Sequence, residues 1–258
     1  MLNDRQKSIL DIIDEQGDVT LNELSQAFSD VSVMTLRRDL LQLEQLGHVL
    51  RNKGGAVSLK KLTEYSQIPG EENEYGLRAR ANIASKKIIA EKALKLVRKG
   101  CSIYLDAGST IMALARMLPN EHFNIITNAT NVAQELIERT NTSVVILGGN
   151  LNRNTLSVSG PSAIKSIDRI NIEMAFMSAS AFTLETGFTV SNVYESELKR
   201  KVISKAKKRI MLMDSSKIGK DLMYTLAELN DIDVLITELD NLPADIKKAA
   251  KAKNIEIL

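Results

Sequence analysis

The residues with the most specific chemistry in this sequence are two consecutive arginines near its N-terminus. Arg37 and Arg38 follow Thr35 within residues 31–40, and a helix over this segment would carry all three away from its apolar side. Arginine can form two hydrogen bonds to guanine, and threonine can contact the methyl group of thymine. The segment therefore predicts a recognition helix for the major groove of DNA. The alternative is a surface helix with two solvated arginines, because such pairs are common.

The residues around these arginines favour a helix with one buried side. Ser32 can act as its N-cap, since a serine hydroxyl can accept a hydrogen bond from an unpaired amide of the first turn. Leu36, Leu40 and Leu43 recur at i, i+4 and i+7 and form one apolar stripe. The stripe leaves other side chains on the remaining faces, namely Met34, Thr35, Arg37, Arg38 and Gln42.

Two further helices are predicted before this one. Asn3 can cap a first helix that ends at Gly17. Thr20 and Glu23 form a capping box in front of a short second helix. Three residues separate the end of that helix, at residue 28, from Ser32, and this is the short turn that a helix-turn-helix requires.

A turn-rich hairpin is predicted after the recognition helix, which ends at Gly47. Two short strands, at residues 48–51 and 56–58, flank a tip made of Asn, Lys and Gly residues. The predicted domain is therefore a winged helix-turn-helix. Arg51 and Lys53 on the wing are candidates for phosphate contacts, with ordinary surface charge as the alternative. The candidate DNA-binding residues are Ser32, Met34, Thr35, Arg37, Arg38, Arg51 and Lys53.

The distribution of charge, rather than its total, supports contact with DNA. Residues 1–30 contain two basic and seven acidic side chains, a net charge of −5. Residues 31–61 contain six basic and two acidic side chains, a net charge of +4. The positive charge is thus concentrated where a recognition helix and a wing would meet phosphates.

Composition predicts a cytoplasmic globular protein. The 258 residues suffice for one large or two modest domains, and 44% of them are hydrophobic and 26% charged. No apolar run approaches the roughly 18 residues that span a bilayer, and the opening residues lack the apolar centre of a signal peptide. The single cysteine, Cys101, excludes an internal disulfide, and with only two histidines a zinc site is not expected. No Gly-x-Gly-x-x-Gly segment or P-loop is present, so neither a dinucleotide nor a nucleoside triphosphate is expected as a cofactor.

The remainder of the chain predicts a mostly parallel α/β domain. Residues 1–58 would form the winged helix-turn-helix, residues 59–76 a polar linker without an apolar period, and residues 77–258 the second domain. Apolar strand-like runs occur at 102–105, 124–127, 144–147, 174–177, 210–213 and 234–237. Amphipathic segments at 110–118, 129–139, 161–168, 194–207 and 244–252 lie between many of them. Such alternation indicates a parallel sheet with helices on its faces, and ligands of such sheets bind beyond the carboxyl ends of the strands.

Polar and glycine residues follow the predicted strands at these carboxyl ends. Residues 106–110, Asp-Ala-Gly-Ser-Thr, follow the first strand and begin a helix whose amides and hydroxyls could hold a phosphate. The alternative is an ordinary turn capped by serine or threonine. Glu195 and Lys199, at i and i+4 of one helix, can form an ion pair, or can be a solvated surface pair. Other strands end in Thr127 and Asn128, in Gly148 and Gly149, and in the segment from Asp214 to Lys217.

The N-terminal segment resembles the signature of the DeoR family of bacterial transcriptional regulators. The matching residues are Val31 and Ser32, Thr35 to Leu40, Leu43 and Glu44, Gly47, Arg51, and Gly54 to Ala56. Lys53 stands where many members have histidine, so the wing keeps a cation. The resemblance extends from Arg5 to about Lys217 and is weaker beyond.

This resemblance implies an effector domain related in fold to ribose-5-phosphate isomerase and to CoA-transferase-like proteins. It implies a regulator, by default a repressor of a sugar-metabolism operon, that binds double-stranded operator DNA and is released by a phosphorylated sugar. A homo-oligomer (a dimer or tetramer) is expected because one winged domain contacts only a short site and repeated half-sites require at least a dimer. The effector-binding residues that the resemblance implies are Asp106, Gly108, Ser109, Thr110, Glu195, Lys199, Asp214 and Lys217. Asn128, Gly148 and Gly149 are added as candidates because they follow predicted strands at the same edge. The family usually has a glycine-alanine pair and a further glycine where this chain has Ser178-Ala179-Ser180-Ala181, and the added side chains could narrow the pocket.

The competing function is a sugar-phosphate isomerase with an appended helical domain. Isomerisation requires a positioned carboxylate that moves a proton beside a carbonyl, and Asp106 and Glu195 could supply carboxylates. However, the segment Ser178-Ala179-Ser180-Ala181 contains no acid where the related isomerases have an acid-rich loop. The sequence therefore favours a regulator over an enzyme.

Overall fold

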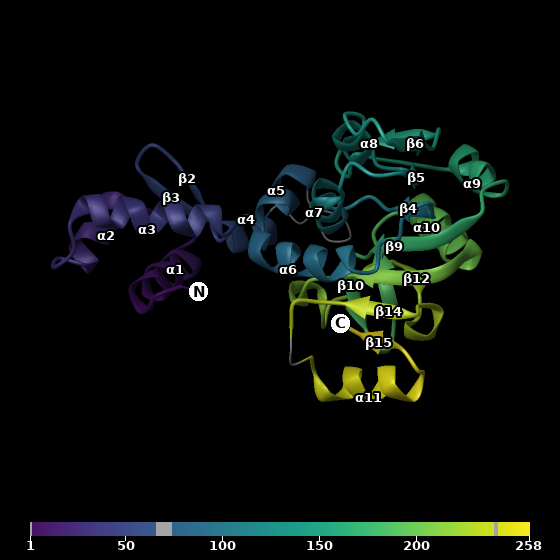
Figure 1. The fold of residues 1–258 in the computed structure, drawn as a ribbon. Helices are drawn as coiled ribbons and strands as arrows, with labels where there is room; N and C mark the ends of the chain where they lie inside the picture. Colours follow the sequence, from purple (N-terminus) through teal and green to yellow (C-terminus); the bar gives the residue numbers. More distant parts are fainter. Residues whose placement is uncertain (1, 66–73, 240–241) are drawn as a thin grey trace. The chain divides into compact units, whose positions relative to one another are not determined.

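The computed structural model describes residues 2–65, 74–239 and 242–258. The described residues form two compact units (Figure 1). The first holds the residues up to 65 together with 76–84, and the second holds residues 74–75 and those from 85 onward. Within these ranges, no helix has both the length and the apolar composition needed to cross a membrane.

The first unit is a winged helix-turn-helix, as predicted. Its elements are α1 (Asp4–Gln16), β1 (Asp18–Thr20), α2 (Leu21–Ala27), α3 (Val33–Gln45), β2 (Val49–Arg51), β3 (Gly55–Ser58) and α4 (Leu59–Tyr65). The three predicted caps are confirmed, because Asn3, Thr20 and Ser32 each accept a hydrogen bond from a backbone amide of the helix that follows. The leucine stripe of α3 is also confirmed, since Leu36, Leu40 and Leu43 are buried in this unit's core.

The wing is closed by a third strand that was not predicted. β1 pairs with β3, and β3 pairs with β2, in an antiparallel sheet of order β1-β3-β2. A Cβ atom at Gly55 would lie 1.9 Å from the Val19 carbonyl oxygen, so only glycine permits this approach of β3 to β1. Part of the predicted linker is helical, because α4 begins directly after β3 and buries Leu59. Residues 66–73 of that linker lie outside the described residues, and the predicted domain boundaries stay predictions.

The described part of the second unit contains a seven-stranded parallel sheet. Its order is β15-β14-β12-β9-β4-β5-β6. The strands are β4 (Ser102–Leu105), β5 (Phe123–Thr127), β6 (Thr142–Ile146), β9 (Ile172–Ser178), β12 (Ala206–Leu212), β14 (Val234–Ile236) and β15 (Glu256–Ile257). All six predicted strands are present, and only the short β15 was not predicted.

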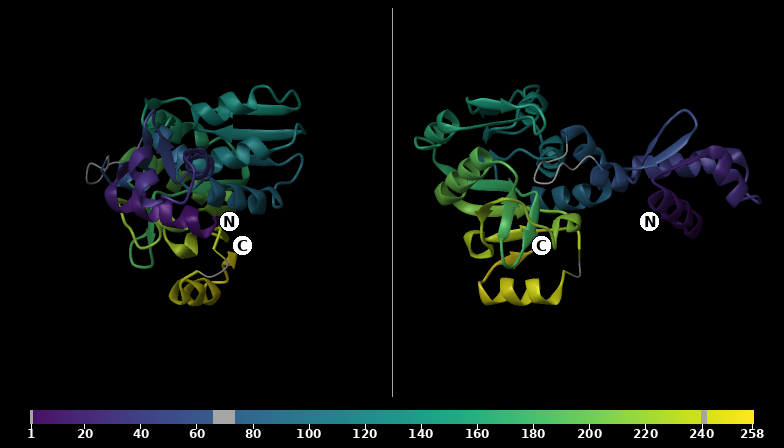
Figure 2. Two further views of the ribbon diagram at one scale, coloured as in Figure 1. Left: turned by 90° about the vertical axis from the view of Figure 1, so that its left-hand side faces the viewer. Right: turned by 180° about the vertical axis from the view of Figure 1, so that it is seen from behind.

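Alternate residues of these strands pack on opposite faces of the sheet. Ile103 and Leu105 of β4 face α6 (Ile83–Leu94), α7 (Ser109–Met117) and α8 (Thr130–Leu136). Tyr104, between them, lies in the core beneath α9 (Pro161–Ile167), α10 (Val193–Lys205) and α11 (Ala244–Ala252). Helices therefore cover both faces, as Figure 2 shows. The five predicted helical segments correspond to α7 to α11.

Smaller elements were not predicted. β10 (Ala181–Thr183), β11 (Gly187–Val190) and β13 (Tyr224–Ala227) form an antiparallel sheet. β7 (Asn150–Asn152) and β8 (Ser157–Ser159) form a hairpin.

The order of the strands places a topological switch point between β4 and β9. The chain runs from β4 to β5 and β6 on one side, then returns to β9, β12, β14 and β15 on the other side. Connections that leave neighbouring strands in opposite directions open a crevice at their carboxyl ends, where ligands of such sheets bind. In this chain that position lies between the end of β4, at Asp106, and the end of β9, at Ser178.

Candidate DNA interface and ligand site

The exposed face of α3 combines apolar and cationic side chains. Met34 is 73% exposed, and Val33 and Leu41 are also exposed. Arg37 and Arg38 are exposed on the same helix. Large exposed apolar side chains beside arginines suit the major groove, which presents thymine methyl groups as well as hydrogen-bonding base edges.

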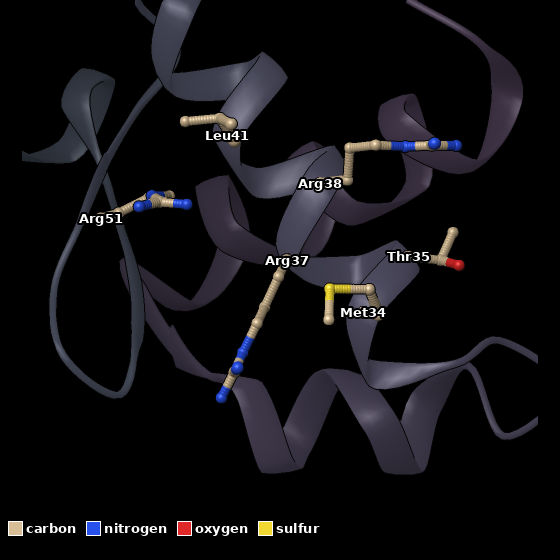
Figure 3. Close-up of a pocket in the computed structure, with 6 residues that line it drawn as sticks. All are labelled: Met34, Thr35, Arg37, Arg38, Leu41 and Arg51. Atoms are coloured by element: carbon tan, nitrogen blue, oxygen red, sulfur yellow. The ribbon is translucent and has the colours of Figure 1, made fainter.

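A shallow pocket of about 360 Å³ is lined by residues of both α3 and the wing. It is lined by Met34, Thr35, Arg37, Arg38, Leu41 and Arg51, and we call it the recognition pocket. Figure 3 shows Arg37 and Arg38 extending from α3 in different directions, while Arg51 extends from the wing toward the helix. Five of the seven predicted DNA-binding residues thus line one surface.

The two remaining candidates lie apart from this pocket. The Ser32 hydroxyl accepts a hydrogen bond from the Thr35 amide (3.2 Å) and lies 2.9 Å from the Thr35 hydroxyl, so it orients the first turn of α3. Lys53 is exposed at the tip of the wing. The tip itself is fixed by a hydrogen bond of 2.9 Å from the Gly54 amide to the Asn52 side chain.

A buried carboxylate anchors α3 to α1, and the sequence interpretation missed it. Asp39 is 2% exposed and accepts hydrogen bonds from Arg5 Nε (2.7 Å) and from the Gln6 side chain (3.1 Å). Asp39 lies three residues after Leu36 and one before Leu40, on the buried side of the apolar stripe. A buried acid requires a hydrogen-bonding or charged partner. The position of Asp39 in the apolar stripe could therefore have indicated this contact.

In the second unit, a buried ion-pair cluster lies at the carboxyl ends of β4 and β9. Asp106 Oδ2 accepts hydrogen bonds from the Ser178 amide (2.9 Å) and from Lys199 Nζ. Lys199 Nζ also donates to the Ser178 carbonyl oxygen (3.0 Å) and pairs with Glu195 Oε1 (3.2 Å). The predicted Glu195–Lys199 pair is confirmed, and the solvated alternative is wrong because both residues are buried. We call Asp106, Ser178, Glu195 and Lys199 the switch-point cluster.

The charges of this cluster restrict what Lys199 can do. Its side chain is 1% exposed and contacts two carboxylates, so its positive charge is already balanced within the protein. Tyr104, nearby, donates its hydroxyl to Asn128 Oδ1 (3.0 Å). Burial, followed by the charges of Asp106 and Glu195, raises the pKa of this phenol well above its usual value, so it remains protonated.

The first turn of α7 leaves several polar groups available. Its N-cap is Gly108, and no side chain caps it, so the alternative of a serine- or threonine-capped turn is wrong. Within the described residues, the hydroxyls of Ser109 and Thr110 make no hydrogen bond to protein. Asp106 Oδ1 is buried and also lacks a partner there. A helix N-terminus with free amides and hydroxyls can bind an anion, and an unpaired buried carboxylate oxygen can accept a hydroxyl.

Ser178 fills the space beside this turn. Its hydroxyl lies 2.9 Å from Asp106 Oδ2 and 2.8 Å from the Ala107 carbonyl oxygen. A Cβ atom at Gly108 would lie 2.7 Å from the same hydroxyl, so a larger residue at position 108 would displace the Ser178 side chain. The serine side chain therefore lies between the ends of β4 and β9, and the narrowing of a pocket there stays a prediction.

The other predicted ligand residues lie at the same edge of the sheet but differ in availability. Asn128 is fully buried. Its side-chain oxygen accepts a hydrogen bond from the Tyr104 hydroxyl, and its side-chain nitrogen donates one to the Val158 carbonyl oxygen (3.1 Å). Gly148 and Gly149 are both exposed, but a Cβ atom at Gly149 would lie 2.5 Å from the Ser159 carbonyl oxygen of β8, whereas nothing lies within 4 Å of one at Gly148. These residues shape the loops rather than present donors.

Asp214 and Lys217 follow β12, the strand that pairs with β9. Asp214 is buried and accepts a hydrogen bond from the Ser216 amide (3.2 Å), which starts the short helix Ser215–Lys217. Lys217 ends this helix and is half-buried. It is thus a cation at the carboxyl edge that is less enclosed than Lys199.

Comparisons with known proteins found two family models that match different parts of this chain. The DeoR-like helix-turn-helix domain matches residues 5–62, and the DeoR C terminal sensor domain matches residues 81–239. The HTH-type transcriptional regulator GolR of Listeria innocua is 36% identical over 236 residues, covering 91% of this chain and 90% of that protein. The L-fucose operon activator of Haemophilus influenzae is 30% identical over 256 residues, covering 98% of each.

Among solved structures, ribose 5-phosphate isomerase a from Methanocaldococcus jannaschii is similar, with a TM-score of 0.40 and 20% identity over 54% of this chain and 55% of that one. The Listeria and Haemophilus relatives match over 90% and 98% of their own lengths and are named a transcriptional regulator and an operon activator. They therefore favour the regulator over the isomerase that the sequence left open.

Proposed function

Because this chain belongs to the DeoR family of helix-turn-helix transcriptional regulators, we propose that it represses a sugar-metabolism operon and is released from its operator by a phosphorylated sugar. Arg38 and Thr35 would contact base edges, and Arg37, Arg51 and Lys53 would contact phosphates. Repression relieved by ligand is what the resemblance implies, whereas the fucose relative is named an activator. The direction of regulation is therefore part of the proposal.

The observation that carries the ligand proposal is the uncapped first turn of α7 beside Asp106. The free hydroxyls of Ser109 and Thr110 and the first amides of α7 would bind the phosphate. The unpaired Asp106 Oδ1 would accept a sugar hydroxyl. Lys199 would be a positioning residue that holds the Asp106 carboxylate, because its own charge is balanced by two acids. Lys217 would supply the cation for the phosphate.

Substitutions at Thr110 and Lys217 should separate ligand binding from DNA binding. Thr110→Ala removes one hydrogen bond and should weaken sugar-phosphate binding by about 0.5–1.5 kcal/mol, and Lys217→Ala should cost about 1.5–3 kcal/mol because a charged donor is lost. Operator affinity without ligand should stay unchanged, because neither residue belongs to the first unit. Titrating sugar phosphate against labelled operator tests both, and a Lys217→Ala protein that responds at the parent's concentration would remove Lys217 from the site.

DNA binding itself can be tested by selection from a random pool of duplexes. The parent protein should enrich a defined sequence, and its affinity for that duplex should fall steeply with salt. The enriched duplex then serves in every later assay. Sugar phosphates that are turned over by the protein without any change in DNA affinity would instead support the isomerase.

We also propose self-association through the second unit, since one winged domain contacts only a short site and repeated half-sites require at least a dimer. Strand β6 lies at an edge of the sheet, carries no charged residue, and exposes Val145 and Ile146. Leu151 and Ile137 are exposed as well. Edge strands without charge, proline or a covering element commonly pair with another chain.

Val145→Lys should therefore convert an oligomer into a monomer at micromolar concentration, because it places a charge on this edge. Leu184→Lys, on the β10–β11 connection, is the matched control and should leave the assembly intact. Sedimentation velocity measures both. A parent protein that sediments as a monomer would contradict self-association, and an oligomeric Val145→Lys protein would exclude the β6 edge.

A further inference from the structure

Glu44 is an acid placed beside a surface proposed to bind a polyanion. It lies in the last turn of α3, and one of its oxygens, Oε1, accepts a hydrogen bond from the Arg51 backbone amide (3.0 Å). Its other oxygen, Oε2, lies 3.2 Å from Arg51 Nε. A single carboxylate therefore holds both the backbone and the side chain of the last residue of β2.

This contact fixes how Arg51 is presented. Arg51 lines the recognition pocket with residues of α3, and the Glu44 pair engages its guanidinium at the Nε side. Within the residues that the structure describes, neither Nη atom of Arg51 makes a hydrogen bond. The four N–H groups on these atoms thus remain available as a planar pair of donors, the arrangement that suits a phosphate.

We propose that Glu44 is a positioning residue for DNA recognition, which holds Arg51 over the recognition pocket and so raises the ratio of specific to non-specific binding. The proposal rests on Arg51 being a DNA contact. A free carboxylate near phosphates opposes binding to any DNA, because like charges repel. A phosphate contact does not itself distinguish sequences, but it fixes the register of the protein on the duplex. An Arg51 held in one position therefore meets its phosphate best when α3 lies in the register of the selected duplex, and less side-chain entropy is then lost on binding.

These two effects predict shifts of opposite sign when Glu44 is removed. Glu44→Ala should weaken binding to the selected duplex about fivefold, which corresponds to about 1 kcal/mol. The same change should tighten binding to a random duplex about twofold to threefold, because one negative charge is removed from the interface. The specificity ratio should therefore fall about tenfold or more. Loss of folding would instead weaken binding to both duplexes.

The experiment measures fluorescence anisotropy with the selected duplex and a random duplex of equal length at one salt concentration. Glu44→Gln keeps an oxygen that can accept from the Arg51 amide, so it should retain more specific affinity than Glu44→Ala. Glu15→Ala removes the same charge from the exposed surface of α1, outside the pocket, and should leave the ratio unchanged. In an Arg51→Ala background, Glu44→Ala should no longer weaken binding to the selected duplex.

Three results would overturn the proposal: an unchanged ratio in Glu44→Ala, equal weakening for both duplexes together with a lower melting temperature, or the same fall in ratio without Arg51. A parent protein that enriches no sequence from the random pool would instead refute the proposed sequence-specific function on which the role of Arg51 depends. Thus the selection with the parent protein tests the proposed function, and the Glu44 variants test the role of Glu44 separately.

Discussion

Replacing Lys199 with methionine is expected to lower the free energy of unfolding of the second unit by about 3–5 kcal/mol. The substitution keeps an apolar stem of similar length but removes the cation that pairs with two buried acids, Asp106 and Glu195. Burying an unpaired charge is costly because the interior replaces water poorly as a solvent for ions. Chemical denaturation monitored by circular dichroism measures the loss.

Lys201 on the same helix provides the matched control for Lys199. Lys201 pairs with Asp168, but both side chains are partly exposed, so Lys201→Ala should cost about 1 kcal/mol or less. Adding Asp106→Asn to the Lys199→Met protein removes one uncompensated charge and should recover part of the lost stability. A Lys199→Met protein as stable as the Lys201→Ala control would show that the cluster does not support the fold.

Arg38→Ala is expected to weaken binding to the selected duplex by about 1–3 kcal/mol and to relax preference at one base position. Arg38 lies three residues after Thr35 on α3, and both line the recognition pocket (Figure 3). Arg37 extends in another direction and is proposed to contact a phosphate. Arg37→Ala should therefore weaken binding to all sequences. It should also reduce the slope of log affinity against log salt concentration by about one, because one phosphate contact is lost.

Repeating the selection with each arginine variant distinguishes the two roles. The Arg38→Ala protein should enrich duplexes that vary at one position, whereas Arg37→Ala should enrich the parent's sequence with lower affinity. Thermal unfolding of both variants should match the parent, because each side chain is exposed. If Arg38→Ala keeps the parent's affinity and sequence preference, its assignment to a base edge is wrong.

The winged helix-turn-helix could be predicted because its signals are local. Ser32 and Thr20 mark the beginnings of helices within three residues of the amides that they cap, and the leucines of α3 repeat with the helical period. Strand β1 was missed because three residues carry too little periodicity, and its pairing depends on Gly55, far along the chain. The short antiparallel sheet was missed for the same reason, since Phe188 of β11 pairs with Ala227 of β13.

The candidate ligand site could be predicted only in part. The loop from Asp106 to Thr110 was found from its position after an apolar run, and the Glu195–Lys199 pair from its helical spacing. The contact of Lys199 with Asp106 joins residues 93 positions apart, and only the parallel pairing of β4 with β9 brings these segments together. Local patterns cannot reveal such a contact, and so the sequence could not show that Lys199 is already paired.

The most direct test of the regulator proposal is one anisotropy titration. The labelled selected duplex is bound by the parent protein, and phosphorylated sugars are added one at a time beside their unphosphorylated counterparts. At least one phosphorylated sugar should release the duplex, and its counterpart should have no effect, because the phosphate contacts at α7 would be missing. By linkage, the same sugar phosphate should bind more weakly to the DNA-bound protein by the same factor. Duplex affinity that no phosphorylated sugar alters, or that free sugars alter equally, would contradict the proposal.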